Sequence, residues 1–373
     1  MDVNNAFLHG AISEDVYMSQ PSSSIHPYFP NHICKLHKAL YGLKQAPQAW
    51  YQELKSFVVA SGFFNVKYVS SLFIYKQDHV IAYFLVYVDD LLLTGNDVTF
   101  LAKFKATLAT KFSLKDLGTP SHFLGVELLP TANGMFLSRE HYIRDILQKG
   151  NMIDSKPIGT LMSTTCSLSS HNDTPNCDSS LFCSIIGSLH YSSITRLDVA
   201  FAVNKMSQYM QSLTTTHMQA LKRILRYLKH TISHGLQLVS TKNLDFTVFC
   251  DADWGGDTND KKFTGVYIVY LDPNAISWSC KIQSTIARSL TEAENRIIGL
   301  MASELLWLQQ LLLELGIKLT KQPTIFSDNI GATYLCTNPI FHSRMKHLAI
   351  DYHFVRDIVV KGELKASHVP SSH

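Results

Sequence analysis

The segment FLVYVDDLLLTG, residues 84–95, places two adjacent aspartates between two runs of apolar residues. A buried carboxylate without a partner loses several kcal/mol of hydration, so the interior of a strand is a poor place for this pair. The longer stretch SSLFIYKQDHVIAYFLVYVDDLLLTG is dominated by aromatic and branched residues and predicts strand, turn, strand, tight turn and strand. We therefore expect Asp89 and Asp90 at the tip of a hairpin.

Helices and a second hairpin are predicted C-terminal to this hairpin. Leu101, Phe104, Leu108 and Phe112 share one helical face behind a capping Asn96 or Asp97. Residues 122–138 predict a hairpin whose turn is Asn133-Gly134. Helical patterns follow at about 139–149, 181–192, 197–211 and 216–230, and the polar stretch 166–180 predicts a flexible connection.

The pattern changes beyond Gly235. Three strand-like segments, LDFTVFCD, FTGVYIVYL and AISWSCKIQ, precede a long amphipathic helix from about 291 to 315. A strand TIFSD, further helices and an extended piece LKASHVP complete the chain. Strands followed by alternating helix and strand predict an α/β domain distinct from the first half.

Composition narrows the class of protein. The 373 residues are enough for two or three domains, and 46% hydrophobic with 17% charged residues describes a globular chain. A net charge of +3 requires that any basic groove be local. Seven scattered cysteines without a CxxC pair argue against a disulfide framework and a zinc site. The sequence shows no secretory leader and no apolar run of membrane-spanning length, so we expect an intracellular protein that is neither secreted nor in a membrane.

Acidic residues from separate segments suggest a metal site in the first half. Asp2 and Phe7 lie in DVNNAF, whereas Asp89 and Asp90 lie in YVDD. Carboxylates without His or Cys among them suit Mg²⁺, and a pair of such ions can activate a hydroxyl group and stabilise a leaving pyrophosphate. A solvated acidic turn is the alternative for the DD motif alone. A third segment, LYGLKQAPQAWY at 40–51, is by itself equally compatible with a helix entry and a packed Trp50.

Taken together, these segments resemble a known family. MDVNNAFLHGAISEDVYMSQP, LHKALYGLKQAPQAWY, LVYVDDLLLTG and LKDLGTPSHFLGVEL are similar to the reverse transcriptase of copia-type LTR-retrotransposon Pol polyproteins, particularly those of plants. The resemblance continues through RLDVAFAVNKMSQYM, LKRILRYLKHT and CDADWGG to FHSRMKHLAIDYHFVRD and covers essentially the whole chain.

The resemblance implies roles in DNA synthesis for residues of the first half. Asp2 and Asp89 match the palm carboxylates that hold two metal ions, with Asp90 as their acidic neighbour, and Phe7 matches the steric gate that excludes a ribose 2′-hydroxyl. Gly42, Lys44 and Pro47 match the motif that packs against template and nucleotide. Phe123, Leu124 and Gly125 open the hairpin that grips the primer end. Lys111 and Lys115 are candidates for phosphate contacts, with surface lysines as the alternative. Lys222, Arg223, Arg226 and Lys229 either face a duplex backbone or form a solvated helix face.

The last third resembles a ribonuclease H domain, which cuts the RNA strand of an RNA–DNA hybrid with two metal ions. Asp251 is expected at the end of the first strand, Glu294 in the first turn of the long helix and Asp328 at the end of the fourth strand. These three match the family's metal carboxylates, whereas Asp253 and Glu292 match non-ligand positions. His342, His347 and His353 fit no zinc spacing, so a structural or substrate-facing role is expected.

The resemblance implies an α/β (α+β) fold with three parts. These are a partial reverse-transcriptase palm at 1–130, a thumb and connection region at 131–236, and a ribonuclease H-like domain with a mixed sheet at 237–373. The implied cofactor is Mg²⁺, two ions per active site, with Mn²⁺ as the alternative. The implied partners are an RNA template, a DNA primer, an RNA–DNA hybrid and dNTPs, in cytoplasmic particles or the nucleus.

Departures from the family lead to three hypotheses. The first aspartate is residue 2, so we expect Asp2 to lack the backbone hydrogen bonds of a complete palm strand, and the chain stops before the helix with the fourth ribonuclease H acid. Leu197 replaces a helix-starting proline, and Asn295 replaces an aromatic residue beside Glu294. The first hypothesis is a polymerase and ribonuclease H with little or no activity. The second is a non-catalytic nucleic-acid-binding remnant, and the third is a product without function.

Overall fold

The computed structural model describes residues 1–163, 168, 178–255, 262–338 and 349–370. The chain divides into two compact units. The first contains Met1–Pro120 with Gln310–Gly316, and the second contains Ser121–Gln309 with Ile317–His373. The predicted boundaries near residues 130 and 236 remain predictions.

The first unit contains an antiparallel sheet of six strands in the order β4-β5-β6-β7-β1-β8. The strands β5, β6 and β7 confirm the predicted strand–turn–strand–turn–strand pattern. The bounds are β1 (Asp2–Val3), β4 (Phe64–Asn65), β5 (Leu72–Gln77), β6 (Val80–Tyr87), β7 (Asp90–Gly95) and β8 (Leu114–Lys115).

Two helices, α1 (Ala46–Ala60) and α2 (Val98–Lys111), provide the helical side of this unit's core. Helix α1 buries Ala46, Trp50, Leu54 and Val58, which recur every fourth residue and so share one face. The cap of α2 is Asp97, whose side chain accepts a hydrogen bond from the Phe100 amide at 2.9 Å. Asn96 instead accepts from the Ile81 amide at 2.8 Å and ties β6 to the loop before α2.

A long hairpin, β2 (Ala11–Ser19) and β3 (Ile33–Lys38), follows the short helix η1 (Ala6–His9) and forms a sheet of its own. Most residues of its two strands are exposed, and the sequence had not led us to predict this hairpin. The Gln20 side chain organises the connecting loop, because its amide donates to the carbonyl of Phe29 at 2.7 Å and to that of His32 at 2.8 Å.

The second unit begins with a four-stranded sheet in the order β12-β11-β10-β9. Its strands are β9 (His122–Phe123), β10 (Val126–Thr131), β11 (Gly134–Ser138) and β12 (Leu236–Val239). The hairpin predicted over 122–138 is present, but its turn lies one residue earlier than Asn133-Gly134, because Thr131 pairs with Gly134. Gly134 lies within β11, where an added Cβ would come within 2.0 Å of the Leu238 carbonyl oxygen. The glycine therefore permits the approach of β12.

A helical bundle accompanies this sheet. It consists of α3 (Glu140–Lys149), α4 (Ser179–Ser192), η2 (Leu197–Val199), α5 (Ala200–Ser207) and α6 (Thr215–His230). The helix predicted over 197–211 is thus a short 3₁₀ turn followed by α5. One apolar core joins the four α-helices, with Ile143, Ile186, Met206 and Leu225 all fully or almost fully buried.

The remainder of the second unit is a mixed sheet in the order β15-β14-β13-β16-β17. Strands β13, β14 and β15 pair antiparallel, whereas β16 and β17 run parallel to β13. The strands are β13 (Phe246–Asp253), β14 (Thr264–Leu271), β15 (Asn274–Ile282), β16 (Thr324–Ser327) and β17 (Lys365–His368). The helices are α7 (Leu290–Glu314), of which residues 290–309 belong to this unit, α8 (Ile330–Thr337) and α9 (Ala349–Val360).

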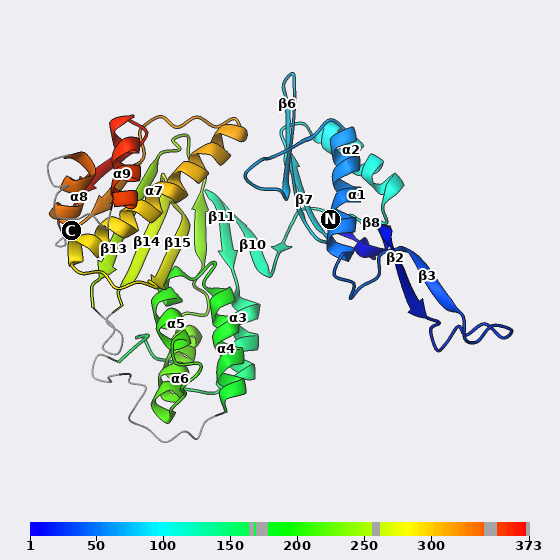
Figure 1. Cartoon of the computed structure of the whole chain (residues 1–373), viewed down its shortest axis with the longest axis horizontal. Helices are drawn as coiled ribbons and strands as arrows, with labels where there is room; N and C mark the ends of the chain where they lie inside the picture. Colours follow the sequence, from blue (N-terminus) through cyan, green and yellow to red (C-terminus); the bar gives the residue numbers. More distant parts are fainter. Residues whose placement is uncertain (164–167, 169–177, 256–261, 339–348, 371–373) are drawn as a thin grey trace. The chain divides into compact units, whose positions relative to one another are not determined.

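Helix α7 crosses one face of this sheet (Figure 1). Gly265 of β14 lies directly against Ile297 of α7, so close that an added Cβ would be 2.0 Å from the Ile297 Cδ1. By length and composition α7 is the one helix of the described residues that could cross a membrane. Ile297, Met301 and Leu305 are buried in the core, as in the central helix of a folded domain.

Candidate functional site

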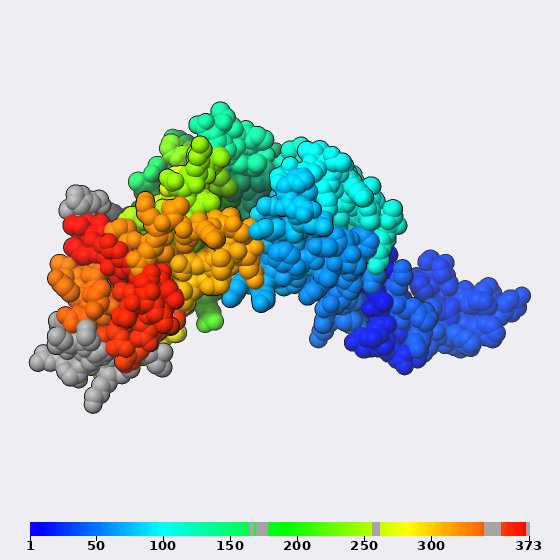
Figure 2. Space-filling view, turned by 90° about the horizontal axis from the view of Figure 1, so that it is seen from above, coloured from blue at the N-terminus to red at the C-terminus, as the bar shows by residue number. Residues whose placement is uncertain are grey.

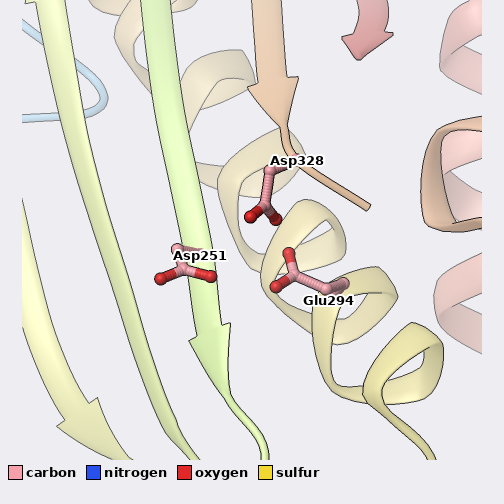
Figure 3. Close-up of side chains that lie close together, drawn as sticks. All are labelled: Asp251, Glu294 and Asp328. Carbon is pink, nitrogen blue, oxygen red and sulfur yellow. The ribbon is translucent and has the colours of Figure 1, made fainter. Parts of the chain in front are cut away.

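Three carboxylates come together beside the mixed sheet (Figure 3). Asp251 lies on β13, Glu294 on α7 and Asp328 directly after β16, and one oxygen of each lies within 4.8 Å of the others. Asp251 and Asp328 are exposed, whereas Glu294 is 1% exposed. Within the described parts of the chain, no other group of three or more His, Cys, Asp or Glu residues lies this close.

The register of two parallel strands explains why Asp251 and Asp328 meet. Phe249 of β13 pairs with Phe326 of β16, and each aspartate lies two residues further along its strand direction. Because β13 and β16 are parallel, both carboxylates lie at the same end of the sheet, towards the carboxyl ends of the two strands. Strand β13 continues past Asp251 to Asp253, and Glu294 is the fifth residue of α7 rather than part of its first turn.

Glu294 is held by two hydrogen bonds inside the site. Its Oε1 accepts from the Ala252 amide at 2.8 Å, and its Oε2 accepts from the Ser327 hydroxyl at 3.2 Å. Burial raises the pKa of Glu294 to about 7, and the negative charge of Asp251 adds to this effect, whereas both hydrogen bonds act in the opposite direction. Three carboxylates this close repel one another unless a proton or a cation neutralises them.

The donor set fits a hard divalent cation. All three candidate ligands are carboxylates from different elements, with no His or Cys among them. Oxygen-only sites of this kind suit Mg²⁺ or Mn²⁺, whereas zinc sites are built mainly from Cys and His with at most a minority of carboxylates.

The neighbouring acids differ in environment. Asp253 is exposed on β13. Glu292 is buried, accepts from the Arg288 amide at 2.9 Å and pairs with Arg296 at 2.8 Å, so it is engaged at the start of the helix. Asn295 is completely buried, and within the described residues neither amide atom has a hydrogen-bond partner.

One histidine that the sequence did not single out lies beside the acidic group. β17 pairs with β16 so that His368 is opposite Ser327, and its Nε2 lies 3.2 Å from the Asp328 carbonyl oxygen. Only the parallel register reveals this contact. Of the three histidines considered in the sequence, His353 is exposed on α9, whereas His342 and His347 lie outside the described residues.

The acids of the first unit meet across a strand pair. Asp2 on β1 is opposite Asp90 on β7 and also pairs with Lys115 on β8. The Val3 amide donates to the Asp89 carbonyl at 3.0 Å, and the Leu91 amide donates to the Met1 carbonyl at 2.9 Å. Contrary to the expectation for Asp2, β1 lies between two strands and is held by backbone hydrogen bonds of both residues that flank Asp2.

Only one aspartate of the predicted hairpin tip lies in the turn itself, because Asp90 is already the first residue of β7. Tyr87 pairs with Asp90, so Val88 and Asp89 form the turn between β6 and β7. Val88 has a φ of +54°, an unfavourable value for a β-branched residue, and the Trp50 indole donates to its carbonyl at 2.7 Å. Burial raises the pKa of Asp90, and the charges of Asp89 and Asp2 raise it further.

The predicted nucleotide-binding and primer-binding residues are divided between the units. Phe7 lies on η1 with its ring centroid 4.6 Å from that of Tyr41. The same unit contains Gly42, Lys44 and Pro47. Gly42 is exposed and has a φ of +96°, Lys44 is exposed, and Pro47 lies at the start of α1. Phe123, Leu124 and Gly125 belong to the second unit, where they form the end of β9 and its turn into β10.

Most of the basic candidates already have partners within the chain. Lys111 pairs with Glu53 at 2.7 Å. Arg223 donates to the Thr160 hydroxyl, Arg226 to the Lys156 carbonyl at 2.6 Å, and Lys229 to the Ser155 carbonyl at 2.7 Å. The basic face of α6 therefore binds the loop after α3. The sequence had suggested either contact with a duplex backbone or a solvated helix face, and neither alternative included this loop. Lys115 and Lys222 are exposed.

Comparison with known proteins places these sites in a family. A family described as reverse transcriptase (RNA-dependent DNA polymerase) matches residues 1–164. The retrovirus-related Pol polyprotein from transposon RE1 of Arabidopsis thaliana is 50% identical over 373 residues, which cover all of this chain and 25% of the relative. A transposon Ty5-1 protein of Saccharomyces cerevisiae is 30% identical over 297 residues, or 79% of this chain and 96% of that protein. The chain belongs to the copia-type Pol polyprotein family.

Within this family, the chain spans about a quarter of the length of the RE1 Pol polyprotein. Among solved structures, a foamy viral protease-reverse transcriptase in complex with an RNA/DNA hybrid has a TM-score of 0.53 at 14% identity. The match covers 99% of this chain and 43% of the viral one. It confirms the predicted fold class of this copia-type Pol chain.

Proposed function

We propose that this Pol chain is an RNA-directed DNA polymerase joined to a ribonuclease H, and that both reactions depend on divalent metal ions. The observation that carries the proposal is the meeting of Asp251, Glu294 and Asp328 within 4.8 Å, from three separate elements. A structural role does not explain why three like charges should converge at one edge of a sheet, since the repulsion destabilises the fold.

In the ribonuclease H site, Asp251 and Asp328 are the exposed carboxylates that hold and orient the metal ions. Glu294 completes the ligand set from the buried side, and its bonds to the Ala252 amide and the Ser327 hydroxyl fix its orientation. Bound Mg²⁺ or Mn²⁺ would supply a water molecule of lowered pKa and neutralise charge on the scissile phosphate. A fixed ligand geometry needs no reorganisation during the reaction.

In the polymerase site, Asp2, Asp89 and Asp90 are the metal-holding acids. Asp2 and Asp90 are opposite one another on β1 and β7, and like charges in this position are unfavourable without a cation. Phe7 is the steric gate for dNTPs, and its contact with Tyr41 restrains the ring. Gly42, Lys44 and Pro47 contact template and nucleotide, and residues 123–125 contact the primer.

The proposed partners are an RNA template, a DNA primer, the RNA–DNA hybrid and dNTPs, within the cell. The foamy viral protein of like fold was solved with an RNA/DNA hybrid, which supports this choice of substrate.

The ribonuclease H proposal is tested with a labelled RNA strand in an RNA–DNA hybrid, with Mg²⁺ and with EDTA. We expect Mg²⁺-dependent cleavage that Asp251→Asn reduces by at least about a hundredfold, as expected for loss of a principal electrostatic group. The matched control is Asp253→Asn, which removes an exposed carboxylate two residues away on the same strand. Equal rates for the two variants, or binding of the hybrid without cleavage by the wild type, would contradict the proposal.

The polymerase proposal is tested by primer extension on an RNA template with Mg²⁺. We expect extension by the wild type and none above background by Asp89→Asn. The RNA cleavage rate of Asp89→Asn should equal that of the wild type, which shows that the variant is folded. Equal background from both proteins rules out polymerase activity.

A further inference from the structure

The turn at the start of the predicted primer-binding hairpin has an unusual backbone. Phe123 pairs with Val126, so Leu124 and Gly125 form a two-residue turn. Leu124 has a φ of +49° and Gly125 a φ of +67°. Positive φ at both central positions is typical of a tight hairpin turn that favours Asn or Gly, and leucine is costly there. The turn therefore needs outside support to keep this conformation.

Tyr191 at the end of α4 supplies that support. Its hydroxyl donates a hydrogen bond to the Leu124 carbonyl at 2.6 Å, across 67 residues of sequence. The Tyr191 ring also lies against Gly125, because an added Cβ there would be 3.4 Å from the hydroxyl oxygen. One side chain thus contacts both turn residues.

A buried arginine fixes Tyr191 from its other side. The Arg139 guanidinium lies 4.0 Å from the centroid of the Tyr191 ring and donates to the Tyr191 carbonyl. Arg139 is 2% exposed, although arginine is almost never buried without specific partners. Its stacking and its hydrogen bond both restrain the same tyrosine, so the ring cannot easily rotate away from the turn.

We propose that Tyr191 is a positioning residue for the primer strand, which acts by holding the Leu124-Gly125 turn in its binding conformation. The inference rests on the proposed polymerase function of the chain. A group that positions a reacting strand affects the rate through small displacements, because productive geometry tolerates little error. Tyr191 contributes through the turn and not by contact with the reacting atoms.

The test compares Tyr191→Phe with Tyr142→Phe. Tyr142 packs edge-on against Tyr191 in the same cluster, but its hydroxyl donates to the Ser188 carbonyl of α4 at 3.2 Å and not to the turn. Each substitution removes a single hydroxyl and leaves the ring in place. Melting temperatures of both variants should stay within about 2 °C of the wild type, since each loses one hydrogen bond of partly exposed groups.

In steady-state primer extension, we expect Tyr191→Phe to lower kcat/KM for the primer–template about three- to tenfold, the factor expected for one hydrogen bond. The KM for dNTPs and the RNA cleavage rate should stay unchanged. Tyr142→Phe should match the wild type in all three. The inference would be overturned if Tyr191→Phe and Tyr142→Phe had the same kcat/KM for the primer–template. It would also be overturned if Tyr191→Phe raised the KM for dNTPs by the same factor as it lowered kcat/KM for the primer–template.

Two further measurements separate this inference from the proposed function. Amide hydrogen exchange of residues 122–128 should accelerate in Tyr191→Phe and not in Tyr142→Phe. The affinity for a duplex with a recessed 3′ end should fall in Tyr191→Phe, with no change for a blunt duplex. If the wild type does not extend primers, the proposed polymerase function fails, and unchanged exchange or unchanged recessed-end affinity separately overturns the role of Tyr191.

Discussion

Arg196 and Asp198 form a two-pronged ion pair, in which Nε donates to Oδ1 at 2.9 Å and a terminal nitrogen donates to Oδ2 at 2.7 Å. The Arg196 side chain is 1% exposed and also donates to the Thr231 carbonyl at 2.9 Å. Tyr227 donates to the same carboxylate at 3.0 Å. The motif TRLDV therefore fastens the start of α5 to the end of α6.

Replacement of Asp198 by Asn should lower the free energy of unfolding by about 2–3 kcal/mol, because it leaves a buried guanidinium without its counter-charge. Burial would raise the pKa of Asp198, but Arg196 outweighs it and the pKa is lowered. The stabilisation is thus present at neutral pH and lost as the pH falls through the lowered pKa. Urea denaturation measures the change.

The control for this prediction is Asp15→Asn. Asp15 pairs with Lys35 at 2.5 Å, but the two side chains are 69% and 46% exposed. Exposed pairs contribute about 0–1 kcal/mol, so this variant should be almost unchanged. If both substitutions lowered the free energy of unfolding equally, burial of the ion pair between Arg196 and Asp198 would not explain its contribution to stability.

The substitution Trp50→Phe should impair polymerisation more than RNA cleavage. It removes the hydrogen bond to the Val88 carbonyl, which supports the strained turn before Asp89. We expect a loss of about 1–3 kcal/mol in stability, since Trp50 is also buried. Primer extension should fall by at least about tenfold if the turn shifts. Ribonuclease H activity of the same preparation is the internal control, and an equal fall in both activities would contradict a local role.

Local sequence patterns predicted the elements well and their partners poorly. The predominance of aromatic and branched residues was sufficient for β5, β6 and β7, and the cap residues predicted the start of α2. The insertion of β1 between β7 and β8 could not be seen, because two residues carry no periodicity. Pairing partners far apart in the sequence are fixed by tertiary packing rather than by local preference.

The same limit applies to the candidate sites. The resemblance to a ribonuclease H domain singled out Asp251, Glu294 and Asp328, but only the parallel register of β13 and β16 brings two of them together. His368 was missed because its contact with Asp328 depends on the pairing of β17. The roles of Arg226 and Lys229 could not be predicted either. The sequence of a basic helix face is the same whether its side chains bind phosphates or bind a loop of the same chain.

The stability of the metal-free protein should depend on Glu294 and on pH. Because burial raises the pKa of Glu294 to about 7, the folded state holds a proton that the unfolded chain releases near its ordinary pKa of 4.5. The free energy of unfolding should therefore decrease as the pH rises from about 4.5 to 7. At about 1.4 kcal/mol per pKa unit, the total effect is at most about 3.5 kcal/mol.

The measurement is thermal unfolding in EDTA between pH 5 and 8, for the wild type and Glu294→Gln. The variant should lose this component of the pH dependence and be more stable than the wild type at pH 8. Addition of Mg²⁺ at pH 8 should stabilise the wild type and have little effect on the variant, because a ligand that binds only the folded state raises its stability. A variant with the same pH dependence as the wild type would exclude Glu294 as its source.

The substitution Asn295→Leu should stabilise the protein. Asn295 is completely buried, and within the described chain its amide has no hydrogen-bond partner, so its burial costs about 1–3 kcal/mol without compensation. Leucine has a similar size and no polar atoms. We expect the free energy of unfolding to rise by about 1–2 kcal/mol. RNA cleavage should remain measurable, because the bonds of Glu294 to Ala252 and Ser327 do not involve Asn295.

The opposite control is Asn295→Asp, which places a second charge beside Glu294 and should destabilise the fold. If leucine lowers the stability, Asn295 has a partner that offsets its burial.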